Sequence, residues 1–516
     1  MTPTLLRGGR ALVGGAVVDA DLVLVGSVFG HVGPPGSAPA VDRVVDLRGG
    51  LVMSAFVDGH VHVTDAGLAL TGLDLSTVRA KSQLLDAVAA RTRQLHGRPV
   101  LGHGWDESTW EDRVVPSAAE LDRASYGSVV YLARVDGHSA LASSALMASV
   151  AGLGALDGHD PAGWLSRAAH HAVRAAALGS LTAGQRMEAQ SRLLRHAASL
   201  GIGSVHEMNG PQIGGYDDVR QLQSLVAEGG LPEVVVYWGQ TAADGGLDCV
   251  RDLGAHGAGG DLFVDGALGS RTACLRTPYA DDARTHGALY LDADAIADHL
   301  VRSTEAGVQA GFHVIGDAAM DAVVRGLASA AAAVGADAIR AAGHRLEHAE
   351  MLDAHQVTVL ADLGLVASVQ PAFDAAWGGT HGMYADRLGV ERASRLNAFS
   401  AMVGAGIALV LGSDAPVTPL DPWGAIRAAV APRTSSYGLD LATALVAHTR
   451  TGHAAVGDLA SGRLVTGAPA TCAVWAADFD PTGWPDLSTG VSPTCLRTVV
   501  RGATVHDSGQ LEEVAA

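Results

Sequence analysis

The chain has 516 residues, 48% of them hydrophobic, and a formal net charge of −19 at pH 7. This size supports a large buried core and more than one domain. The acidic balance argues against a nucleic-acid partner, because the phosphate backbone would repel the chain. The four cysteines show no C-x-x-C spacing, which argues against a disulfide framework and against a thiolate metal site.

Both ends of the chain are rich in short β-like runs. These runs lie at 11–18, 22–25 and 41–47, and again at 472–475, 496–500 and 503–505. We expect residues 1–50 and 464–516 to combine into a small β-sandwich beside a central domain of residues 51–463. The first residues lack an apolar segment followed by a cleavage site, so the expected location is the cytoplasm.

Apolar runs that end in polar residues recur through the central domain. They cover 52–62, 201–207, 233–238, 261–266, 307–313, 344–348, 365–370 and 407–414. Stretches of helical character lie between several of them, at 190–199, 295–306, 317–333 and 391–404. Eight strands alternating with helices predict an α/β fold, a (β/α)8 TIM barrel, whose chemistry sits at the C-terminal ends of the strands.

The connection between the first two strands, residues 68–200, is far longer than an ordinary βα loop. It contains strand-like pieces at 99–106 and 128–134 and helical pieces at 81–95 and 170–177. We therefore expect an inserted α+β subdomain. A second unusual stretch, 396–413, carries no charge, but its glycines favour a buried helix followed by a buried strand over a membrane span.

The motif FVDGHVH places His60 and His62 at the end of the first strand. Residues i and i+2 of a strand point to the same face, so both imidazoles would reach in one direction. Such a pair suits a divalent metal such as zinc. Taken alone, the pair is also compatible with two surface histidines at a strand end.

Other strand ends supply further ligand types: His313, His348 and Asp414. Each has a structural alternative, namely a buried core histidine, a helix-start residue and a helix N-cap. For the metal interpretation to be wrong, all three structural alternatives would have to be true at once, each at the corresponding end of its strand. The joint pattern therefore predicts a metal site at the C-terminal mouth of the barrel.

The motifs FVDGHVH, FHVIGD, RLEHAE, SVQP and GSDAPV resemble the amidohydrolase superfamily. With HGWDEST, VDGHSA, SVHEM and DGALGSRTA, they are similar to its amidohydrolase-3 branch, which includes N-substituted formamide deformylases. The resemblance implies a metal-bearing barrel with a β-sandwich and hydrolysis of C–N bonds. It also implies that the metal ligands are His60, His62, His313, His348 and Asp414.

The chain departs from this family at one position. Relatives commonly carry a lysine in K-x-F-x-D-G, which becomes carboxylated and bridges two metals, but this chain has Asp261 there and its one lysine is Lys81. Asp261 or Glu207 could bridge two metals as an ordinary carboxylate, with Asp265 as a further bridging or outer carboxylate. Otherwise the site holds a single zinc, the interpretation that the sequence slightly favours.

The expected chemistry is attack of a metal-bound hydroxide on an amide-like, non-peptide C–N bond of a small molecule. Asp414 would carry the proton from water to the leaving nitrogen, while His348 would help to stabilise the developing oxyanion. A deaminase and a carbamate or lactam hydrolase are alternatives on the same site. A barrel that has lost turnover and only binds a ligand is a third.

The insert is expected to roof the substrate pocket. Candidate substrate-binding residues are Trp105, His138, Arg271, Arg345 and Gln370. Each has a structural alternative, such as a core tryptophan or an arginine paired with a neighbouring carboxylate like Glu347. The expected partner is a small-molecule substrate, with neither nucleic acid nor membrane, and a homodimer is left open.

Overall fold

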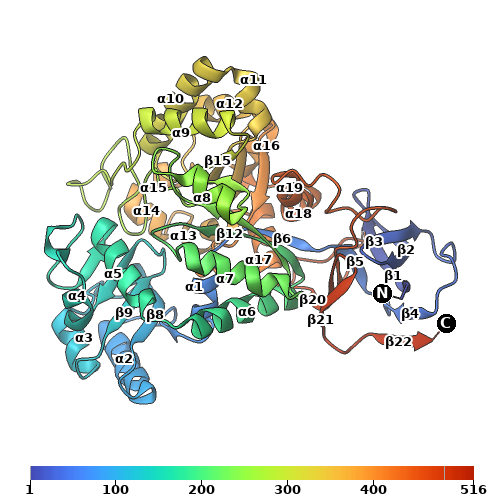
Figure 1. Ribbon diagram of the computed structural model, residues 1–516, viewed down its shortest axis with the longest axis horizontal. Coiled ribbons are helices and arrows are strands. Elements are labelled where there is room, and N and C mark those ends of the chain that lie inside the picture. Colours follow the sequence, from blue (N-terminus) through green and yellow to red (C-terminus); the bar gives the residue numbers. More distant parts are fainter. Residues whose placement is uncertain (1, 482, 516) are drawn as a thin grey trace.

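The computed structural model describes residues 2–481 and 483–515, which form three parts (Figure 1). A barrel occupies the middle of the molecule. A sheet built from both ends of the chain lies on one side of it, at the right of Figure 1, and the insert lies on the other.

The barrel contains eight parallel strands, each paired with the next along the chain. They are β6 (Phe56–Val61), β12 (Ile202–Asn209), β13 (Glu233–Trp238), β14 (Gly257–Ala258), β15 (Gln309–Val314), β16 (Arg345–His348), β17 (Val366–Val369) and β18 (Ala408–Leu411). This confirms the predicted (β/α)8 architecture.

The chain just beyond β18 meets the end of β6 and brings the barrel close to closure. The Asp414 N–H donates to the His60 carbonyl at 2.8 Å, and the His62 N–H donates to the Ala415 carbonyl at 2.9 Å. A Cβ on Gly412 would lie 2.6 Å from the His60 nitrogen, so only glycine allows this approach. The closure brings the GSDAPV and FVDGHVH motifs side by side.

Helices surround the barrel, in keeping with the apolar faces that the sequence places between strands. They are α1 (Val63–Ala69), α6 (Ala183–Ser199), α7 (Tyr216–Ala227), α8 (Gly246–Leu253), α9 (Ala293–Glu305), α10 (Asp317–Val334), α11 (Ala336–Ala342), α12 (Ala354–Asp362), α13 (Pro371–Trp377), α14 (Met383–Leu388), α15 (Val390–Ala393), α16 (Phe399–Ala405), α17 (Pro422–Val430), α18 (Leu441–Ala447) and α19 (Arg450–Ala454).

Several predicted elements differ from the structure. The first run, 52–62, is divided between a strand of the sheet built from the chain ends (Leu51–Ser54) and β6, and the terminal run 11–18 is interrupted by a turn at Gly14 and Gly15. The fourth barrel strand is the two-residue β14, not 261–266, where only Phe263 forms a bridge, to His313. Gly260 takes a φ of +78° and turns the chain out of the strand. The helix expected over 391–404 is broken into α15 and α16, and Asn397 between them has a φ of +57°.

The insert contains a five-stranded sheet in the order β11-β10-β9-β8-β7. Its strands are β7 (Leu73–Asp74), β8 (Val100–Trp105), β9 (Val130–Arg134), β10 (Ser139–Ala142) and β11 (Trp164–Ser166), and its helices are α2 (Lys81–Leu95), α3 (Ala118–Ala124), α4 (Ser144–Ala148) and α5 (Arg167–Gly179). Short 3-10 turns occur at Glu107–Thr109 and Leu153–Ala155, and another follows α17 at Ser435–Tyr437.

The terminal segments form one branched nine-stranded sheet in the described residues. Its strands are β1 (Thr4–Val13), β2 (Ala16–Val25), β3 (Val28–Gly33), β4 (Arg43–Asp46), β5 (Leu51–Ser54), β19 (Cys472–Ala476), β20 (Thr494–Val500), β21 (Ala503–Asp507) and β22 (Glu512–Ala515). β5 pairs with β19, which joins the two ends of the chain, and leads directly into β6.

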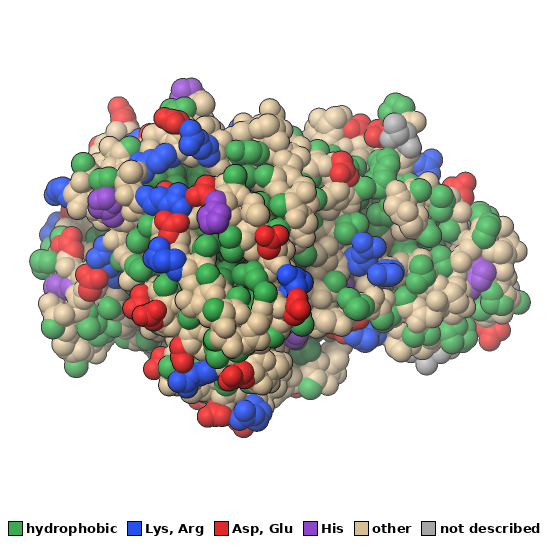
Figure 2. All heavy atoms as spheres, turned by 90° about the horizontal axis from the view of Figure 1, so that it is seen from above, with side chains coloured by type: hydrophobic (Ala, Val, Ile, Leu, Met, Phe, Trp, Pro, Cys, Tyr) green, Lys and Arg blue, Asp and Glu red, His purple; other side chains and the backbone are tan. Residues whose placement is uncertain are grey.

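Within the described residues, no single helix has the length and apolar character needed to cross a bilayer. Only α10 and α11 together meet that test, and they are bent by 113°. The uncharged stretch at 396–413 contains α16 and β18, as its glycines predict. On the face in Figure 2, acidic and basic side chains are interspersed.

Candidate metal centre

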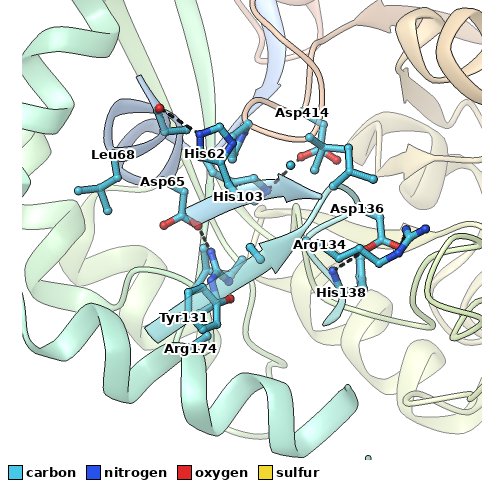
Figure 3. Close-up of a pocket in the computed structure, with 18 of the residues that line it drawn as sticks. His62, Asp65, Leu68, His103, Tyr131, Arg134, Asp136, His138, Arg174 and Asp414 are labelled. Carbon is cyan, nitrogen blue, oxygen red and sulfur yellow. Dashed lines mark hydrogen bonds and ion pairs between the residues drawn. The ribbon is translucent and has the colours of Figure 1, made fainter. Parts of the chain in front are cut away.

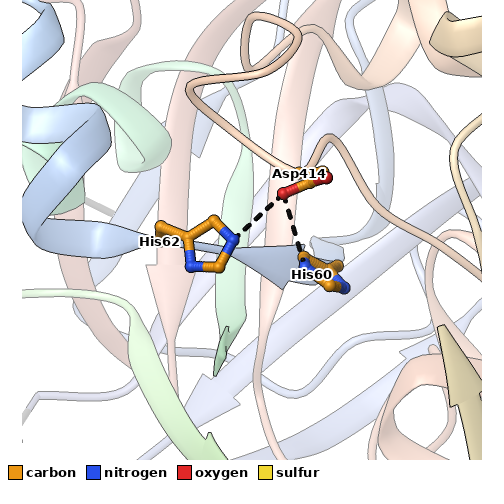
Figure 4. A group of neighbouring side chains, drawn as sticks. All are labelled: His60, His62 and Asp414. Atoms are coloured by element: carbon orange, nitrogen blue, oxygen red, sulfur yellow. Dashed lines mark ion pairs between the residues drawn. The ribbon is translucent and has the colours of Figure 1, made fainter. Parts of the chain in front are cut away.

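Six side chains from four strand ends and one loop converge at the C-terminal mouth of the barrel. Asp414 Oδ1 lies 3.1 Å from His62 Nε2 and 3.4 Å from His60 Nε2 (Figure 4). About 3.3 Å separates ligand atoms around a tetrahedral ion with bonds of about 2.05 Å. These side chains form the His/Asp cluster: His60, His62, Asp261, His313, His348 and Asp414.

Asp261 lies in the middle of the His/Asp cluster. Its Oδ2 is 3.1 Å from His62 Nε2, whereas its Oδ1 is 3.3 Å from His313 Nδ1 and 3.9 Å from His348 Nε2. One carboxylate therefore touches both the FVDGHVH side of the cluster and the side formed by the fifth and sixth strands. That is the position a bridging ligand needs.

Three of the four cluster histidines have their outer ring nitrogen already occupied by a hydrogen bond. His60 Nδ1 donates to Glu347 Oε2 at 2.9 Å, and His62 Nδ1 donates to the Met208 carbonyl at 2.9 Å. His348 Nδ1 donates to Gln370 Oε1 at 2.7 Å. These bonds fix the ring orientation and leave each Nε2 lone pair aimed at the cluster, as metal-binding histidines require.

Three buried ligand atoms have no hydrogen-bond partner within the part of the chain that the structure describes: His60 Nε2, His348 Nε2 and Asp414 Oδ1. Unpartnered buried polar atoms are costly, and bound cations would satisfy them. His348 and Asp414 also have left-handed backbone, with φ of +69° and +53°. Such strain in non-glycine residues persists mainly where a functional site demands it. The donor set therefore fits a divalent metal.

The electrostatics of the cluster point the same way. Burial opposes charge on His60, but Asp414 and Asp261 prevail and raise its pKa to about 10. Burial would raise the pKa of Asp414, yet His60 and His62 bring it below its usual value. The carboxylates thus create a strongly cation-attracting point, which a metal can occupy by displacing imidazole protons.

An open pocket of about 1020 Å³ leads to the cluster (Figure 3). Asp261, His313 and Asp414 form its floor, and the insert supplies one wall. That wall includes His138, whose ring centroid lies 5.0 Å from that of His313. Burial, followed by the nearby His313, lowers the pKa of His138 to about 4, which favours its neutral form.

Two carboxylates that the sequence offers as bridges are engaged with backbone instead. Glu207 accepts from the Val63 N–H at 2.6 Å, and Asp265 accepts from the Ile315 N–H at 2.9 Å. Burial is the main cause that raises the pKa of Glu207 to about 8 and that of Asp265 to about 7. They hold the ends of β6 and β15 that carry cluster histidines.

Of the five candidate substrate-binding residues, the structure places only His138 in the lining of the 1020 Å³ pocket. Trp105 is buried in the core of the insert, and Arg271 pairs with Asp281 at 2.7 Å. Arg345 is buried and pairs with Glu347 at 2.7 Å. Gln370 contacts the cluster through His348. Arg345 and Gln370 therefore support cluster histidines from behind.

The motifs HGWDEST, VDGHSA and DGALGSRTA meet around a second set of buried charges. Arg134, fully buried, donates to Asp106, Glu107 and Asp136 at 2.8–2.9 Å. Arg387 donates to the other oxygen of Glu107 at 2.8 Å. This ion network, made of these five residues, joins the insert to the barrel through α14.

Sequence reasoning missed several residues of the pocket wall. His171 and Arg174 on α5 line it, and Arg174 is paired with Asp65. The spacing of residues along α5 cannot predict which of its faces lines a pocket, because the opposite wall of that pocket comes from the barrel. Glu350, next to the cluster, stood in the quoted RLEHAE motif, but nothing in that motif distinguished it from a helix-start acid.

The barrel and the buried His/Asp cluster together define a metal-dependent hydrolase of the TIM-barrel class. The amidohydrolase family model matches residues 43–506, so the chain belongs to the amidohydrolase family. This confirms the resemblance that the motifs indicated.

Individual relatives agree. The chain is 28% identical to Protein LONG AFTER FAR-RED 3 of Arabidopsis thaliana, covering 90% of this chain and 83% of that protein. It is 24% identical to the N-substituted formamide deformylase of Arthrobacter pascens, covering 77% of each. An uncharacterized metal-dependent hydrolase from Pyrococcus furiosus has a similar structure, with 26% identity, a TM-score of 0.70 and coverage of 92% of this chain and 99% of that one. These likenesses and the donor set support a divalent metal.

Proposed function

We propose that this chain is a zinc hydrolase that cleaves a non-peptide, amide-like C–N bond of a small molecule. One observation carries the proposal: three buried ligand atoms, for which the described residues offer no hydrogen-bond partner, belong to two overlapping groups of His and Asp side chains that share His60. The similarity to an N-substituted formamide deformylase supports the choice of a C–N bond.

The ligand set favours zinc, because imidazole and carboxylate donors at these separations suit it. His60, His62 and Asp414 would hold one ion, and His313 and His348 a second, with Asp261 shared between them. The sequence slightly favoured a single ion, but the central position of Asp261 favours two. Bound metal would supply Lewis-acid polarisation of a carbonyl and a more acidic water.

The protein's own groups would handle the proton and the substrate. The Asp414 carboxylate would take a proton from the attacking water and pass it to the departing nitrogen, which leaves only when protonated. Neutral His138, across the pocket floor from His313, would orient the substrate carbonyl by hydrogen bonding. Gln370 and Glu347 would hold His348 and His60 in place during turnover.

The test is metal analysis of the purified protein together with a screen of N-formyl amines, N-acyl amines and amino-heterocycles. We expect about two zinc ions per chain and hydrolysis of at least one of these classes. Folded protein that takes up no divalent metal would favour the ligand-binding barrel. Metal-loaded protein that hydrolyses none of the three classes would also overturn the proposal.

A further inference from the structure

A second cavity opens beside the His/Asp cluster, on the side of α13 and α14. It has about 320 Å³ of empty space, much less than the 1020 Å³ of the open pocket. Both cavities are lined by His138, His313 and Asp414. A molecule bound at the cluster can therefore place a large part in the open pocket and a small part in this second cavity, which we call the Glu350 chamber.

Glu350 supplies the one carboxylate of the chamber wall that belongs neither to the cluster nor to the ion network. The residue is 3% exposed, and its carboxyl group interacts with the side chains of Tyr384 and Asn397, but its Oε2 atom finds no geometrically sound hydrogen-bond partner among the described residues. Its backbone is fixed, because its carbonyl accepts from the Asn397 N–H at 3.0 Å. A buried carboxylate oxygen without a hydrogen bond destabilises the protein, and a ligand N–H or O–H group that donates to it would remove this cost.

The other walls of the chamber are largely apolar and aromatic. They include Phe373, Trp377, Met383 and Tyr384. The rings of Phe373 and Trp377 are 5.0 Å apart, and those of Trp377 and Tyr384 are 6.1 Å apart. Aromatic faces attract cations. A carboxylate among aromatic rings therefore selects a cationic or N–H-bearing group and repels an anionic one.

We propose that the Glu350 chamber binds the nitrogen end of the substrate, as a small primary amino or amidino group whose N–H donates to Glu350. The inference rests on the proposed function and names its substrate class: primary amides, amidines or amino-substituted carbons. In the reaction the C–N bond breaks and a C–O bond to water forms. The nitrogen takes a proton from that water and departs as ammonia.

The test uses two planar molecules of similar size, the cation formamidinium and the neutral formamide. Binding to metal-loaded protein is measured by calorimetry for the wild type, Glu350→Gln and the matched surface variant Glu391→Gln. Glu391 is exposed on α15 and pairs with Arg395. Binding is independent of turnover, so it tests the chamber separately from the hydrolytic activity.

We expect the wild type and Glu391→Gln to prefer formamidinium over formamide. Glu350→Gln should bind formamidinium about tenfold more weakly, as expected for loss of one charge-assisted hydrogen bond. Glu350→Asp, which keeps the charge, should retain the preference and covers the case in which the glutamine variant does not fold. Equal formamidinium affinity in the wild type and Glu350→Gln would overturn the inference, as would a wild type that prefers formamide.

The two proposals can fail separately. Formamidinium binding that depends on Glu350, without hydrolysis of any screened class, would contradict the proposed function alone. Hydrolysis of N-formyl amines with no effect of Glu350→Gln on formamidinium would contradict the chamber assignment alone, since the small end would then be the acyl group.

Discussion

The His/Asp cluster and the ion network are both sets of buried charges, but they are completed differently. In the ion network, Arg134 makes an ion pair with each of three carboxylates, and Arg387 uses the remaining oxygen of Glu107. In the His/Asp cluster, His60, His348 and Asp414 each keep one atom that no described residue hydrogen-bonds.

The difference separates structure from chemistry. A network of guanidinium and carboxylate groups that satisfies itself needs nothing from solution and can hold two parts of a protein together. A cluster with unpartnered lone pairs is incomplete until a cation arrives. Variants in the first should therefore change stability, and variants in the second should change metal binding and turnover.

The largest effect should come from Asp414→Asn. The amide cannot accept the proton from water, so we expect kcat to fall by about 10³-fold, in the range for loss of a general base. Far-UV circular dichroism should remain that of the wild type. Asp248→Asn, at an exposed position on α8, is the matched control and should keep full activity. Near-wild-type turnover of Asp414→Asn would remove the residue from its proposed role.

Arg134→Met should have the largest effect on stability. It leaves Asp106, Glu107 and Asp136 without their shared guanidinium, and breaking a buried ion pair costs about 3–5 kcal/mol. Denaturant unfolding measures the change, and metal content of the folded fraction should stay at the wild-type value. Arg192→Met, which disrupts an exposed pair with Glu188, serves as control. Equal free energies of unfolding for Arg134→Met and Arg192→Met would contradict the expected difference between buried and exposed ion pairs.

Asp261→Asn sharpens the comparison within the His/Asp cluster. Asparagine keeps the shape but loses the charge that two ions would share, so we expect the metal content to fall from about two ions per chain to about one. Mass spectrometry of the purified variant gives the count. Retention of both ions would show that Asp261 is not the bridge.

The smallest predicted effect is on acid stability. Burial alone would raise the pKa of Glu107, but Arg134 and Arg387 lower it below the usual 4.5. A lowered carboxyl pKa adds stability above that usual value, and this contribution is lost as the pH falls below it. The free energy of unfolding of Glu107→Gln should therefore depend less on pH below 4.5 than that of the wild type. Parallel profiles would contradict this prediction.

Much of the fold could be predicted because each barrel strand is an apolar run that ends in a polar residue. His60, His313 and Asp414 stood out for that reason. The fourth strand was misplaced because Gly259 and Gly260 end it early. A Cβ on Gly259 would lie 2.3 Å from Gly311, a long-range approach that no local pattern reveals.

The ion network could not be predicted from sequence. Glu107 and Arg387 are 280 positions apart in the sequence. Both are charged residue types, which usually lie at the protein surface, so the sequence gives no reason to expect them buried together. Trp105 likewise stood in a conspicuous motif, yet its N–H donates to the Leu132 carbonyl inside the insert. Motifs identified which residues matter, but only the three-dimensional arrangement separated those that build the pocket from those that hold its walls.

The central carboxylate of the cluster is encoded directly, as Asp261, rather than made by adding carbon dioxide to a lysine amine. In an enzyme that relies on a carboxylated lysine, the lysine amine must react with dissolved carbon dioxide before the second metal ion can bind. Here that requirement disappears, so assembly of the cluster should be indifferent to bicarbonate in the refolding buffer and to the gas above it.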